Sequence, residues 1–358
     1  MRVVVVGASG NVGTALLRAL RDEGTVTGVV GIARRVPTTV PPAPYDIARW
    51  AQVDLGAQGP DGPVVDQLVH AFIGADAVVL LSWALQPTHQ RDVRRRTNVD
   101  GARRAIQAVV QAGVPHLVVA SSVGAYSPAD DDVPHGEDWP TDGVRSSDYS
   151  VDKVAVERLL DEAQVLHPDL RIARVRPALI FQRGAGSAIE RYFLGPALPA
   201  AALRWPLPVL PWPRGFRLQA VHADDVAQVY RAIVTGRYAG AFNVAAPDVL
   251  RGPEVASVVS RGRCLEVPVG AARAAVTVGW SLRAVAVSPG WVDLAQAVPL
   301  LDTARVRADL GWQPRWTAVE ALADLVHGMA HGSGTASPPM RPRRRASRSL
   351  VGGQTSVR

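Results

Sequence analysis

The sequence predicts an α/β fold built around a doubly wound parallel sheet. Two observations carry this prediction. Near-continuous apolar runs, such as four valines at residues 3–6 and Ala-Val-Val-Leu-Leu at residues 77–81, are typical of strands buried on both faces. Segments with apolar residues at helical spacing, such as residues 12–20 and 98–112, separate these runs. Strand and helix therefore alternate along the chain, as parallel βαβ units require.

The other elements follow from the same two patterns. Strands are expected at residues 3–6, 26–32, 77–81, 117–120, 172–175 and 242–244, with a short one leading from Trp50 to Asp54. Helices are expected at residues 12–20, 98–112, 151–163, 224–234 and 318–327. We expect one domain over residues 1–331, with a core at 1–180 and 215–247 and a small C-terminal substrate-binding lobe at 181–214 and 248–331.

A glycine-rich loop joins the first strand to the first helix, with the sequence Gly7-Ala8-Ser9-Gly10-Asn11-Val12-Gly13. Glycine permits the tight turn and lets the backbone approach a pyrophosphate, whose charge the helix N-terminus favours. In this strand–turn–helix context the GxxGxxG spacing predicts a Rossmann-type dinucleotide site rather than a merely structural turn. The predicted contacts come from Gly7, Ser9, Gly10, Asn11, Val12 and Gly13.

The end of the second strand bears on the choice of dinucleotide. Sites that prefer NAD place an acidic residue about 20 residues beyond the glycine loop, where it holds the ribose 2′-hydroxyl. Here the strand ends in Arg34 and Arg35 without a carboxylate. Two guanidiniums suit a 2′-phosphate, so NADP is favoured over NAD. Asp54, after the next strand, either accepts from the adenine amino group or only caps a turn.

Three polar side chains form a candidate catalytic site. Ser122 follows the strand at residues 117–120, and Tyr149 and Lys153 begin a predicted helix with the spacing that places both on one face. A tyrosine acts as a base near neutrality only if its pKa falls by about 3 units, and an adjacent ammonium lowers it. Lys153 is the only lysine beside 38 arginines, which marks it for a task that a guanidinium does not perform.

With these motifs in place, the chain resembles the extended short-chain dehydrogenase/reductases, also called the NAD(P)-dependent epimerase/dehydratase family. The resemblance covers about residues 1–328 and includes Asn98-Val99-Asp100-Gly101, Tyr149 to Lys153, Arg176-Pro177 and the sequence at 221–226. It implies a Rossmann sheet and a catalytic triad of Ser122, Tyr149 and Lys153. It also implies a homodimer as one possible assembly. It also implies dinucleotide contacts from Asp54, Leu55, Leu81, Ser82, Tyr149, Lys153 and Pro177.

The predicted function is hydride transfer between NAD(P) and a secondary alcohol or ketone. Nucleotide-sugar members carry an asparagine soon after the Arg-Pro pair, where this chain has Ala178-Leu179-Ile180, and an arginine at the position of Leu218, with Arg217 one step away. An epimerase or dehydratase of nucleotide sugars with tightly bound NAD is therefore the alternative. A non-catalytic NAD(P)-sensing protein is a further alternative.

Trp205 and Trp212, in the apolar segment 192–213, either line the substrate pocket or pack the lobe.

Composition excludes other classes. Cys264 is alone, which rules out a disulfide framework within the chain, and the N-terminus runs directly into a strand without a signal-peptide pattern. Segment 192–213 holds six prolines, so no membrane span is expected, and we expect a cytoplasmic protein. His222, Asp224 and Asp225 together suggest a metal site, but the two aspartates, immediately before a predicted helix, are interpreted as its N-caps, and no metal site is expected.

The net charge of +7 arises mainly from the C-terminal segment. Residues 332–358 carry six arginines and no acidic residue, whereas residues 1–331 carry 33 basic and 32 acidic side chains. A nearly neutral body gives no reason to expect nucleic-acid binding. Because residues 332–358 are rich in Ser, Pro, Gly and Arg and lack apolar periodicity, we expect a disordered tail.

Overall fold

A seven-stranded parallel sheet forms the centre of the computed structural model, which describes residues 1–37, 41–85, 89–194 and 204–342. The strand order is β11-β7-β5-β4-β1-β2-β3, and every neighbouring pair is parallel. The strands are β1 (Arg2–Val6), β2 (Gly28–Ala33), β3 (Ala48–Gln52), β4 (Ala77–Leu80), β5 (His116–Ala120), β7 (Arg171–Pro177) and β11 (Gly240–Val244). The order reverses direction beside β1, as in a doubly wound Rossmann fold, and confirms the predicted fold class.

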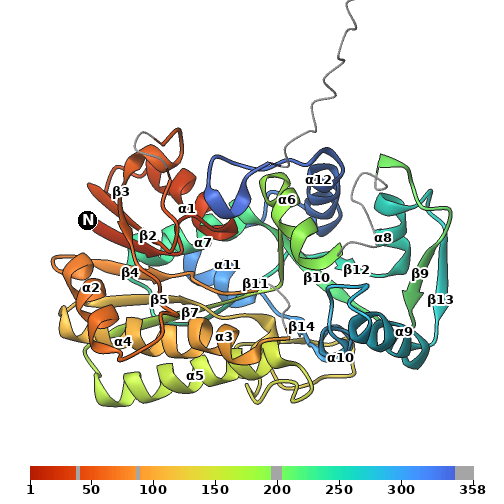
Figure 1. Cartoon of the computed structure of the whole chain (residues 1–358), viewed down its shortest axis with the longest axis horizontal. Helices are drawn as coiled ribbons and strands as arrows, with labels where there is room; N and C mark the ends of the chain where they lie inside the picture. Colours follow the sequence, from red (N-terminus) through yellow and green to blue (C-terminus); the bar gives the residue numbers. More distant parts are fainter. Residues whose placement is uncertain (38–40, 86–88, 195–203, 343–358) are drawn as a thin grey trace, which may run out of the picture.

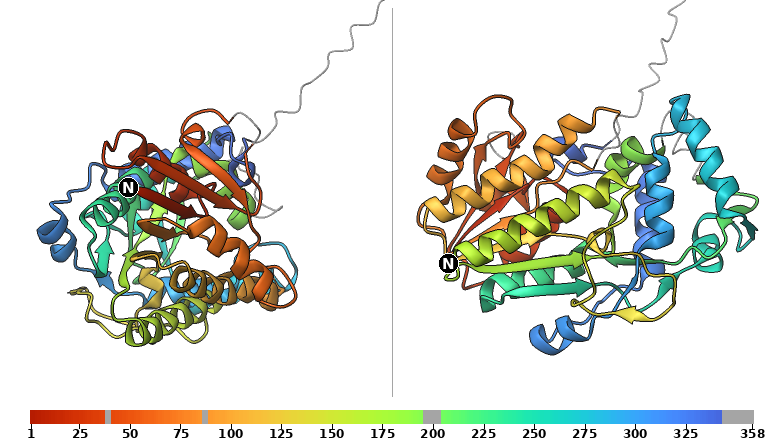
Figure 2. Two further views of the ribbon diagram at one scale, coloured as in Figure 1. Left: turned by 90° about the vertical axis from the view of Figure 1, so that its left-hand side faces the viewer. Right: turned by 90° about the horizontal axis from the view of Figure 1, so that it is seen from below.

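Helices cover both faces of this sheet (Figure 1). On one face lie α2 (Gly62–Phe72), α4 (Gly101–Gln111) and α5 (Asp148–Leu166), which run side by side in the right-hand view of Figure 2. On the other face lie α1 (Asn11–Arg21) and α7 (Ala223–Gly236). The predicted helices at 12–20, 151–163 and 224–234 are thereby confirmed, with each end displaced by a few residues.

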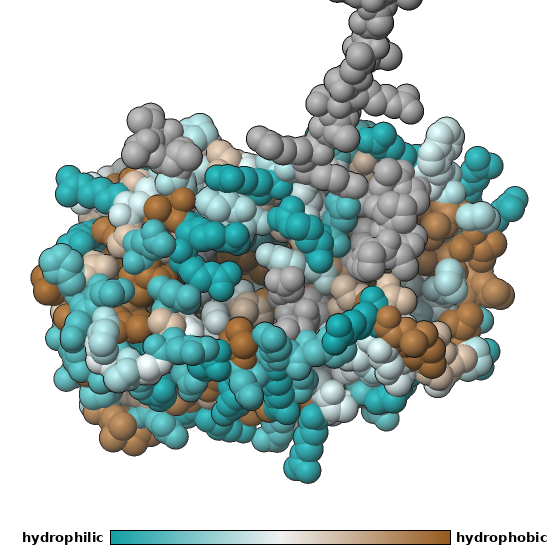
Figure 3. Space-filling view, viewed as in Figure 1, coloured by the Kyte–Doolittle hydropathy of each residue, from teal (hydrophilic) through white to brown (hydrophobic). Residues whose placement is uncertain are grey.

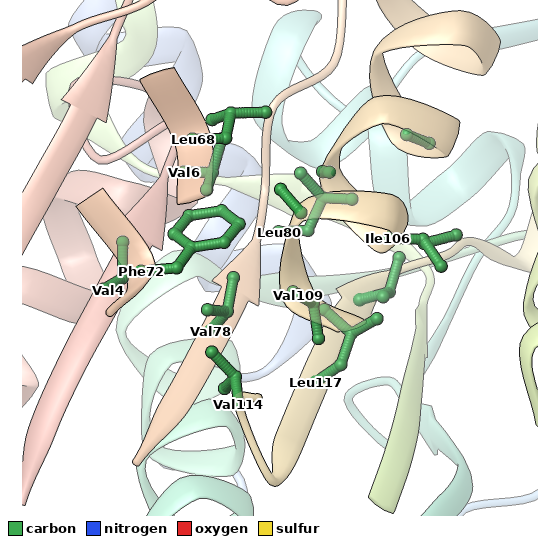
Figure 4. Close-up of a cluster of buried hydrophobic side chains, with 14 of the residues drawn as sticks. Val4, Val6, Leu68, Phe72, Val78, Leu80, Ile106, Val109, Val114 and Leu117 are labelled. Atoms are coloured by element: carbon green, nitrogen blue, oxygen red, sulfur yellow. The ribbon is translucent and has the colours of Figure 1, made fainter. Parts of the chain in front are cut away.

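The four valines of β1 show why the apolar runs are uninterrupted. Val4 and Val6 pack with Phe72 and Leu68 of α2 on one face, as Figure 4 shows, whereas Val3 and Val5 pack against the α1 and α7 face. All four valines have no exposed surface. Successive side chains of a strand point to opposite faces, so a sheet covered on both sides requires apolar residues at every position.

The remaining elements gather beyond the carboxyl ends of the central strands. One small sheet consists of β8 (Leu179–Phe181), β10 (Leu218–His222) and β12 (Val249–Leu250). A second consists of β9 (Leu210–Pro213) and β13 (Cys264–Val267). A third pairs β6 (Pro134–His135) with β14 (Leu300–Leu301). The helices here are α3 (Arg91–Arg95), α6 (Gly186–Ile189), α8 (Gly252–Val259), α9 (Val269–Ser281), α10 (Pro289–Ala297) and α12 (Ala318–His331). We call β9, β13, α8, α9 and α10 the outer lobe.

One helix that the sequence assigns to the lobe belongs to the central layer. Helix α11 (Ala304–Leu310) lies against β11 and α7, and Val306 and Trp312 are buried in the same cluster as Val3 and Val5. The indole N–H of Trp312 donates to the carbonyl of Asp225, 3.0 Å away. The chain thus returns to the central sheet after the lobe. The Pro- and Trp-rich composition of the second half does not predict this return.

The prediction of a disordered tail is wrong for residues 332–342. Ser337 is fully buried and donates its hydroxyl to the carbonyl of Ser9 in the glycine loop, and the Tyr45 hydroxyl donates to Thr335 over 2.6 Å. Met340 is 2% exposed and packs on Ala185 and Ala188. One methionine and a few hydroxyls anchor this segment, so no periodic pattern reveals it. Residues 343–358, the rest of the predicted tail, lie outside the described residues.

The surface of the outer lobe carries exposed apolar side chains. Leu265 of β13 and Val278 of α9 are about 60% exposed, Leu282 is 74% exposed, and none of the residues of α9 is buried. Brown, hydrophobic atoms gather over β13 and α9 in the space-filling view (Figure 3). Among the described residues no helix is both long and apolar enough to cross a membrane.

Candidate active site

The glycine loop opens onto a cavity of about 910 Å³ at the carboxyl ends of the central strands. Gly7 has φ +90°, and a Cβ there would lie 2.7 Å from the amide nitrogen of Ser82 at the end of β4. A Cβ on Gly13 would lie 2.4 Å from the carbonyl oxygen of Gly7. The loop therefore closes on itself and on β4 so tightly that only glycine fits at these two positions.

All the residues that the sequence nominates for catalysis or dinucleotide contact line this one cavity. They are Gly7, Ser9, Gly10, Asn11, Val12, Gly13, Arg34, Arg35, Asp54, Leu55, Leu81, Ser82, Ser122, Tyr149, Lys153 and Pro177. Arg34 and Arg35 are exposed where β2 ends, and the Asp54 carboxylate accepts from the amide of Gly56 while it faces the cavity. The two interpretations of Asp54 are thus compatible, because one carboxylate oxygen holds the turn.

Local hydrogen bonds fix Ser122 and Tyr149 relative to each other. Ser122 follows β5 in an extended conformation and accepts from the amide of Gly124, 3.0 Å away. Helix α5 begins at the cap residue Ser147, and Ser150 next to Tyr149 donates to the Gly124 carbonyl over 2.6 Å. The start of α5 is therefore tied to the turn that carries Ser122. The Ser122 hydroxyl lies close enough to the Tyr149 phenol to lower its pKa.

Lys153 lies one turn further along the same face of α5 and is 3% exposed. Its ammonium donates to the carbonyl of Ala120 at the end of β5, 2.8 Å away, and lies 3.5 Å from the centroid of the Trp83 ring. Trp83 also contacts Tyr149 edge to face, with ring centroids 5.8 Å apart. The ammonium is thus held by one carbonyl and one aromatic face, which is a favourable cation–π arrangement.

The electrostatics of the pair differ from the sequence-based expectation. Burial raises the pKa of Tyr149 to about 12, with the hydrogen bond from Ser122 opposing the rise. Burial lowers the pKa of Lys153 to about 7, against the attraction of Glu157 and Asp152. The pKa of Tyr149 is therefore raised in the structure, opposite to the fall expected from the sequence. The reason is geometric, since Lys153 is bonded to Ala120 and covered by Trp83 rather than bonded to the phenol oxygen.

A buried ion pair between Glu157 and Arg176 lies next to Ser122, Tyr149 and Lys153 and links the elements that carry them. Glu157, two turns after Tyr149 on α5, accepts from Arg176 of β7 over 2.9 and 3.1 Å and from the Ser121 hydroxyl over 2.5 Å. Arg176 donates further to Tyr126 over 3.0 Å. Burial alone would raise the pKa of Glu157, but Arg176 and Ser121 lower it below its usual value. This network joins α5, β7 and the residue before Ser122.

The far wall of the cavity is apolar and comes mostly from the lobe. Trp291 of α10 stacks obliquely on Tyr149 with ring centroids 4.9 Å apart, and Leu294 and Val298 continue the same wall. Ile189, Tyr192 and Phe193 also line the cavity, and Phe193 contacts Trp291 edge to face with ring centroids 5.5 Å apart. Sequence reasoning missed this wall, because nothing in the spacing of α10 indicates that it folds back onto Tyr149.

The two tryptophans considered for this role lie elsewhere. Trp205 is 77% exposed, and Trp212 donates to the carbonyl of Phe216 and packs inside the lobe. Neither lines the cavity within the described part of the chain, so their interpretation as pocket residues is wrong. For Trp212 the alternative interpretation, packing of the lobe, is correct.

The residues weighed as metal ligands have other partners. His222 precedes α7 and accepts from the amide of Asp224 through Nδ1, 3.2 Å away, so His222 is the N-cap of this helix. The prediction that the aspartates are the N-caps is wrong, because α7 begins at Ala223 and both lie inside its first turn. The Asp225 carboxylate accepts from the amides of Arg315 and Trp316. Across the described ranges no group of three or more His, Cys, Asp or Glu side chains has the arrangement of a metal site.

Comparison with known families agrees with this geometry. The model of the NAD dependent epimerase/dehydratase family matches residues 3–245. The chain belongs to that family. The resemblance found in the sequence is thereby confirmed for more than half of the chain.

Individual relatives are more distant. An uncharacterized protein of Mycobacterium tuberculosis (strain ATCC 25618 / H37Rv) is 29% identical over 331 residues, which cover 91% of this chain and 30% of the relative. This chain thus spans less than a third of the length of that relative. The UDP-glucose 4-epimerase of Thermus thermophilus in complex with NAD is 18% identical, with a TM-score of 0.66 and coverage of 92% and 99% of the two chains.

A second solved structure has the same fold. The dTDP-glucose 4,6-dehydratase DesIV of Streptomyces venezuelae with NAD and TYD bound is 18% identical, with a TM-score of 0.66 and coverage of 92% and 96% of the two chains. At this level of identity the likeness establishes the architecture of the chain and leaves its substrate open.

Proposed function

We propose that this chain is an NAD(P)-dependent oxidoreductase that interconverts a secondary alcohol and a ketone, with Ser122, Tyr149 and Lys153 as its catalytic residues. The observation that carries the proposal is the convergence of these three side chains and the glycine loop on one cavity. The bound nicotinamide ring would accept or donate the hydride at the reacting carbon. Tyr149 would move the proton at the substrate oxygen, and Ser122 would hydrogen-bond the same oxygen.

The apolar wall supports a substrate with an apolar body. Two polar side chains of the lining are largely held by the chain itself: the Gln219 amide pairs with the backbone of Leu301, and the Arg217 guanidinium donates to the carbonyls of Ala129 and Asp130. Trp291, Leu294 and Val298 are then the surfaces left for a substrate to cover. A hydrocarbon-rich ketone or alcohol gains free energy there by leaving water.

The alternative is a nucleotide-sugar epimerase or dehydratase that retains NAD, and the solved relatives favour it. The Thermus thermophilus relative is a UDP-glucose 4-epimerase with NAD, and the Streptomyces venezuelae relative is a dTDP-glucose dehydratase. The two functions differ in an observable way. An alcohol dehydrogenase or ketoreductase changes the NAD(P)H absorbance stoichiometrically with turnover, whereas an epimerase leaves it unchanged over a complete cycle.

We expect Tyr149→Phe to lower turnover by about 10²- to 10⁴-fold, because the substituted ring keeps its contacts with Trp83 and Trp291 but carries no proton. The assay screens apolar ketones, alcohols and nucleotide sugars with NADPH, NADH and their oxidised forms. Dinucleotide binding, followed by fluorescence titration, serves as the control and should persist. Unchanged turnover in the variant would refute the proposed role of Tyr149. Dinucleotide binding without any turnover would favour a sensor.

We propose NADP as the preferred dinucleotide, supported by Arg34 and Arg35 at the edge of the cavity. Arg34→Ala should weaken NADP binding about tenfold or more and leave NAD binding nearly unchanged, since a charge-assisted hydrogen bond contributes roughly 1.5–3 kcal/mol. Arg49→Ala is the matched control, because Arg49 is an exposed arginine of β3 outside the cavity lining. Equal loss of NAD and NADP affinity in Arg34→Ala would contradict the assignment.

A further inference from the structure

Tyr230 of α7 is a fully buried tyrosine whose hydroxyl has no hydrogen-bond partner among the described residues. The other two fully buried tyrosines are satisfied. The Tyr45 hydroxyl bonds to Thr14 over 3.0 Å, and the Tyr126 hydroxyl bonds to Asn243 over 2.7 Å. A buried hydroxyl without a partner destabilises a fold, so phenylalanine would be the better residue here if packing were its only role.

The position of Tyr230 points to a ligand rather than to the core. Its ring packs in the cluster beneath the central sheet, and the residue also belongs to the lining of the cavity, together with Leu81, Ala120 and Pro177. These three residues lie at the ends of β4, β5 and β7. Tyr230 therefore reaches the floor of the cavity from the α7 side of the sheet.

This part of the cavity is the end where the chemistry would occur. Tyr230 lies close enough to Tyr149 for the two phenols to interact electrostatically, and burial raises the pKa of Tyr230 far above its usual range. It therefore remains a proton donor throughout the working pH range. Arg34 and Asp54, at the ends of β2 and β3, mark the opposite, adenine end of the dinucleotide site.

We propose that Tyr230 is a positioning residue that donates a hydrogen bond to the carboxamide of the nicotinamide ring. Lys153 and Tyr149 approach the cavity from α5 on one face of the sheet, whereas Tyr230 approaches from α7 on the other. The ring would then be fixed from both sides, with its reactive carbon held at a constant orientation toward Tyr149. The inference rests on the proposed dinucleotide site, and it concerns a residue that the family motifs do not include.

The test compares the wild-type chain with its Tyr230→Phe variant, using calorimetric titration with NADP⁺, NAD⁺, and ADP-ribose with and without the 2′-phosphate. The inference expects binding of the preferred dinucleotide to weaken about fivefold or more, and ADP-ribose binding to remain unchanged, because ADP-ribose lacks the nicotinamide ring. The ligand-free variant should melt at the same or a higher temperature than the wild type, since an unsatisfied hydroxyl is removed.

Tyr126→Phe is the matched control, because it removes a buried hydroxyl that has partners and lies outside the cavity lining. It should lower the melting temperature and leave the ratio of dinucleotide to ADP-ribose affinity as in the wild type. Wild-type dinucleotide affinity in Tyr230→Phe, or an equal loss of ADP-ribose affinity, would overturn the inference. If the wild-type protein bound neither dinucleotide nor ADP-ribose, the proposed function itself would fail, which is a distinct result.

Discussion

Replacing Lys153 by arginine is expected to lower turnover by about 10²-fold or more, although the chain uses arginine at every other basic position. The site around the ammonium is small: the Ala120 carbonyl lies 2.8 Å from Nζ, and the Trp83 ring lies 3.5 Å from it. An arginine is longer and ends in a planar fork, so it would displace the Trp83 ring that also contacts Tyr149.

The measurement is turnover with a substrate from the screen, together with dinucleotide affinity. Arg158→Lys provides the reciprocal control, because Arg158 is on the same helix, is about half exposed and lies outside the cavity. That variant should keep wild-type turnover. Near-normal activity of Lys153→Arg would show that any cation suffices and that the single lysine is incidental.

Lys153 also predicts a pH signature in stability. Its pKa is about 7 in the folded chain and near 10.5 when unfolded, so between these values the unfolded state binds one more proton. The free energy of unfolding should therefore rise with pH from about 7 toward 10, by at most about 1.4 kcal/mol per pH unit from this group. Above pH 10 the trend reverses, because the buried Tyr126 and Tyr149 keep protons that the unfolded chain releases.

Lys153→Met should remove the rise between pH 7 and 10, since the sequence contains no other lysine. Denaturant titrations at several pH values measure this directly. A rise that persisted in Lys153→Met would assign the proton to a different group.

The fold could be predicted because its elements repeat one pattern. The inner strands of the central sheet lie between two layers of helices, so apolar runs such as Val3 to Val6 mark them clearly, whereas the edge strand β3 exposes Arg49 and shows no such run. The segment 332–342 could not be predicted in this way. Its order depends on Met340 inserting beside Ala185 and on Ser337 reaching the Ser9 carbonyl, contacts between residues far apart in the chain.

In the candidate site, too, residues with a local sequence pattern could be predicted, and residues placed by tertiary packing could not. The glycine loop, Ser122, Tyr149 and Lys153 could be predicted because their chemistry requires fixed residue types at fixed local spacing. Trp291 and Tyr230 could not, because each reaches the cavity only through the packing of α10 or α7. Composition drew attention to Trp205 instead, yet an indole's place inside or outside a cavity depends on tertiary contacts that composition does not encode.

Replacing Glu157 by glutamine is expected to lower the free energy of unfolding by about 3–5 kcal/mol, because it leaves the buried Arg176 guanidinium without its counter-charge. Glu157 is 1% exposed and bonds to both Arg176 and Ser121. Its pKa is held below its usual value, so the stability that this ion pair contributes is present at neutral pH and is lost as the pH falls through that lowered pKa.

Two controls separate this effect from a general weakness of α5. Arg158, the residue after Glu157 on α5, forms exposed ion pairs with Asp142 and Asp161. Arg158→Ala removes these pairs and should lower the free energy of unfolding by at most about 1 kcal/mol. The double variant Glu157→Met, Arg176→Met should recover much of the lost stability, because it removes both buried charges. Arg174, which also pairs with Glu157, keeps its ion pair with Asp161. Equal losses in Glu157→Gln and Arg158→Ala would show that the buried pair is no more important than a surface one.

Because Ser121 precedes Ser122, Glu157→Gln should also reduce turnover, and the double variant should restore stability without restoring turnover fully.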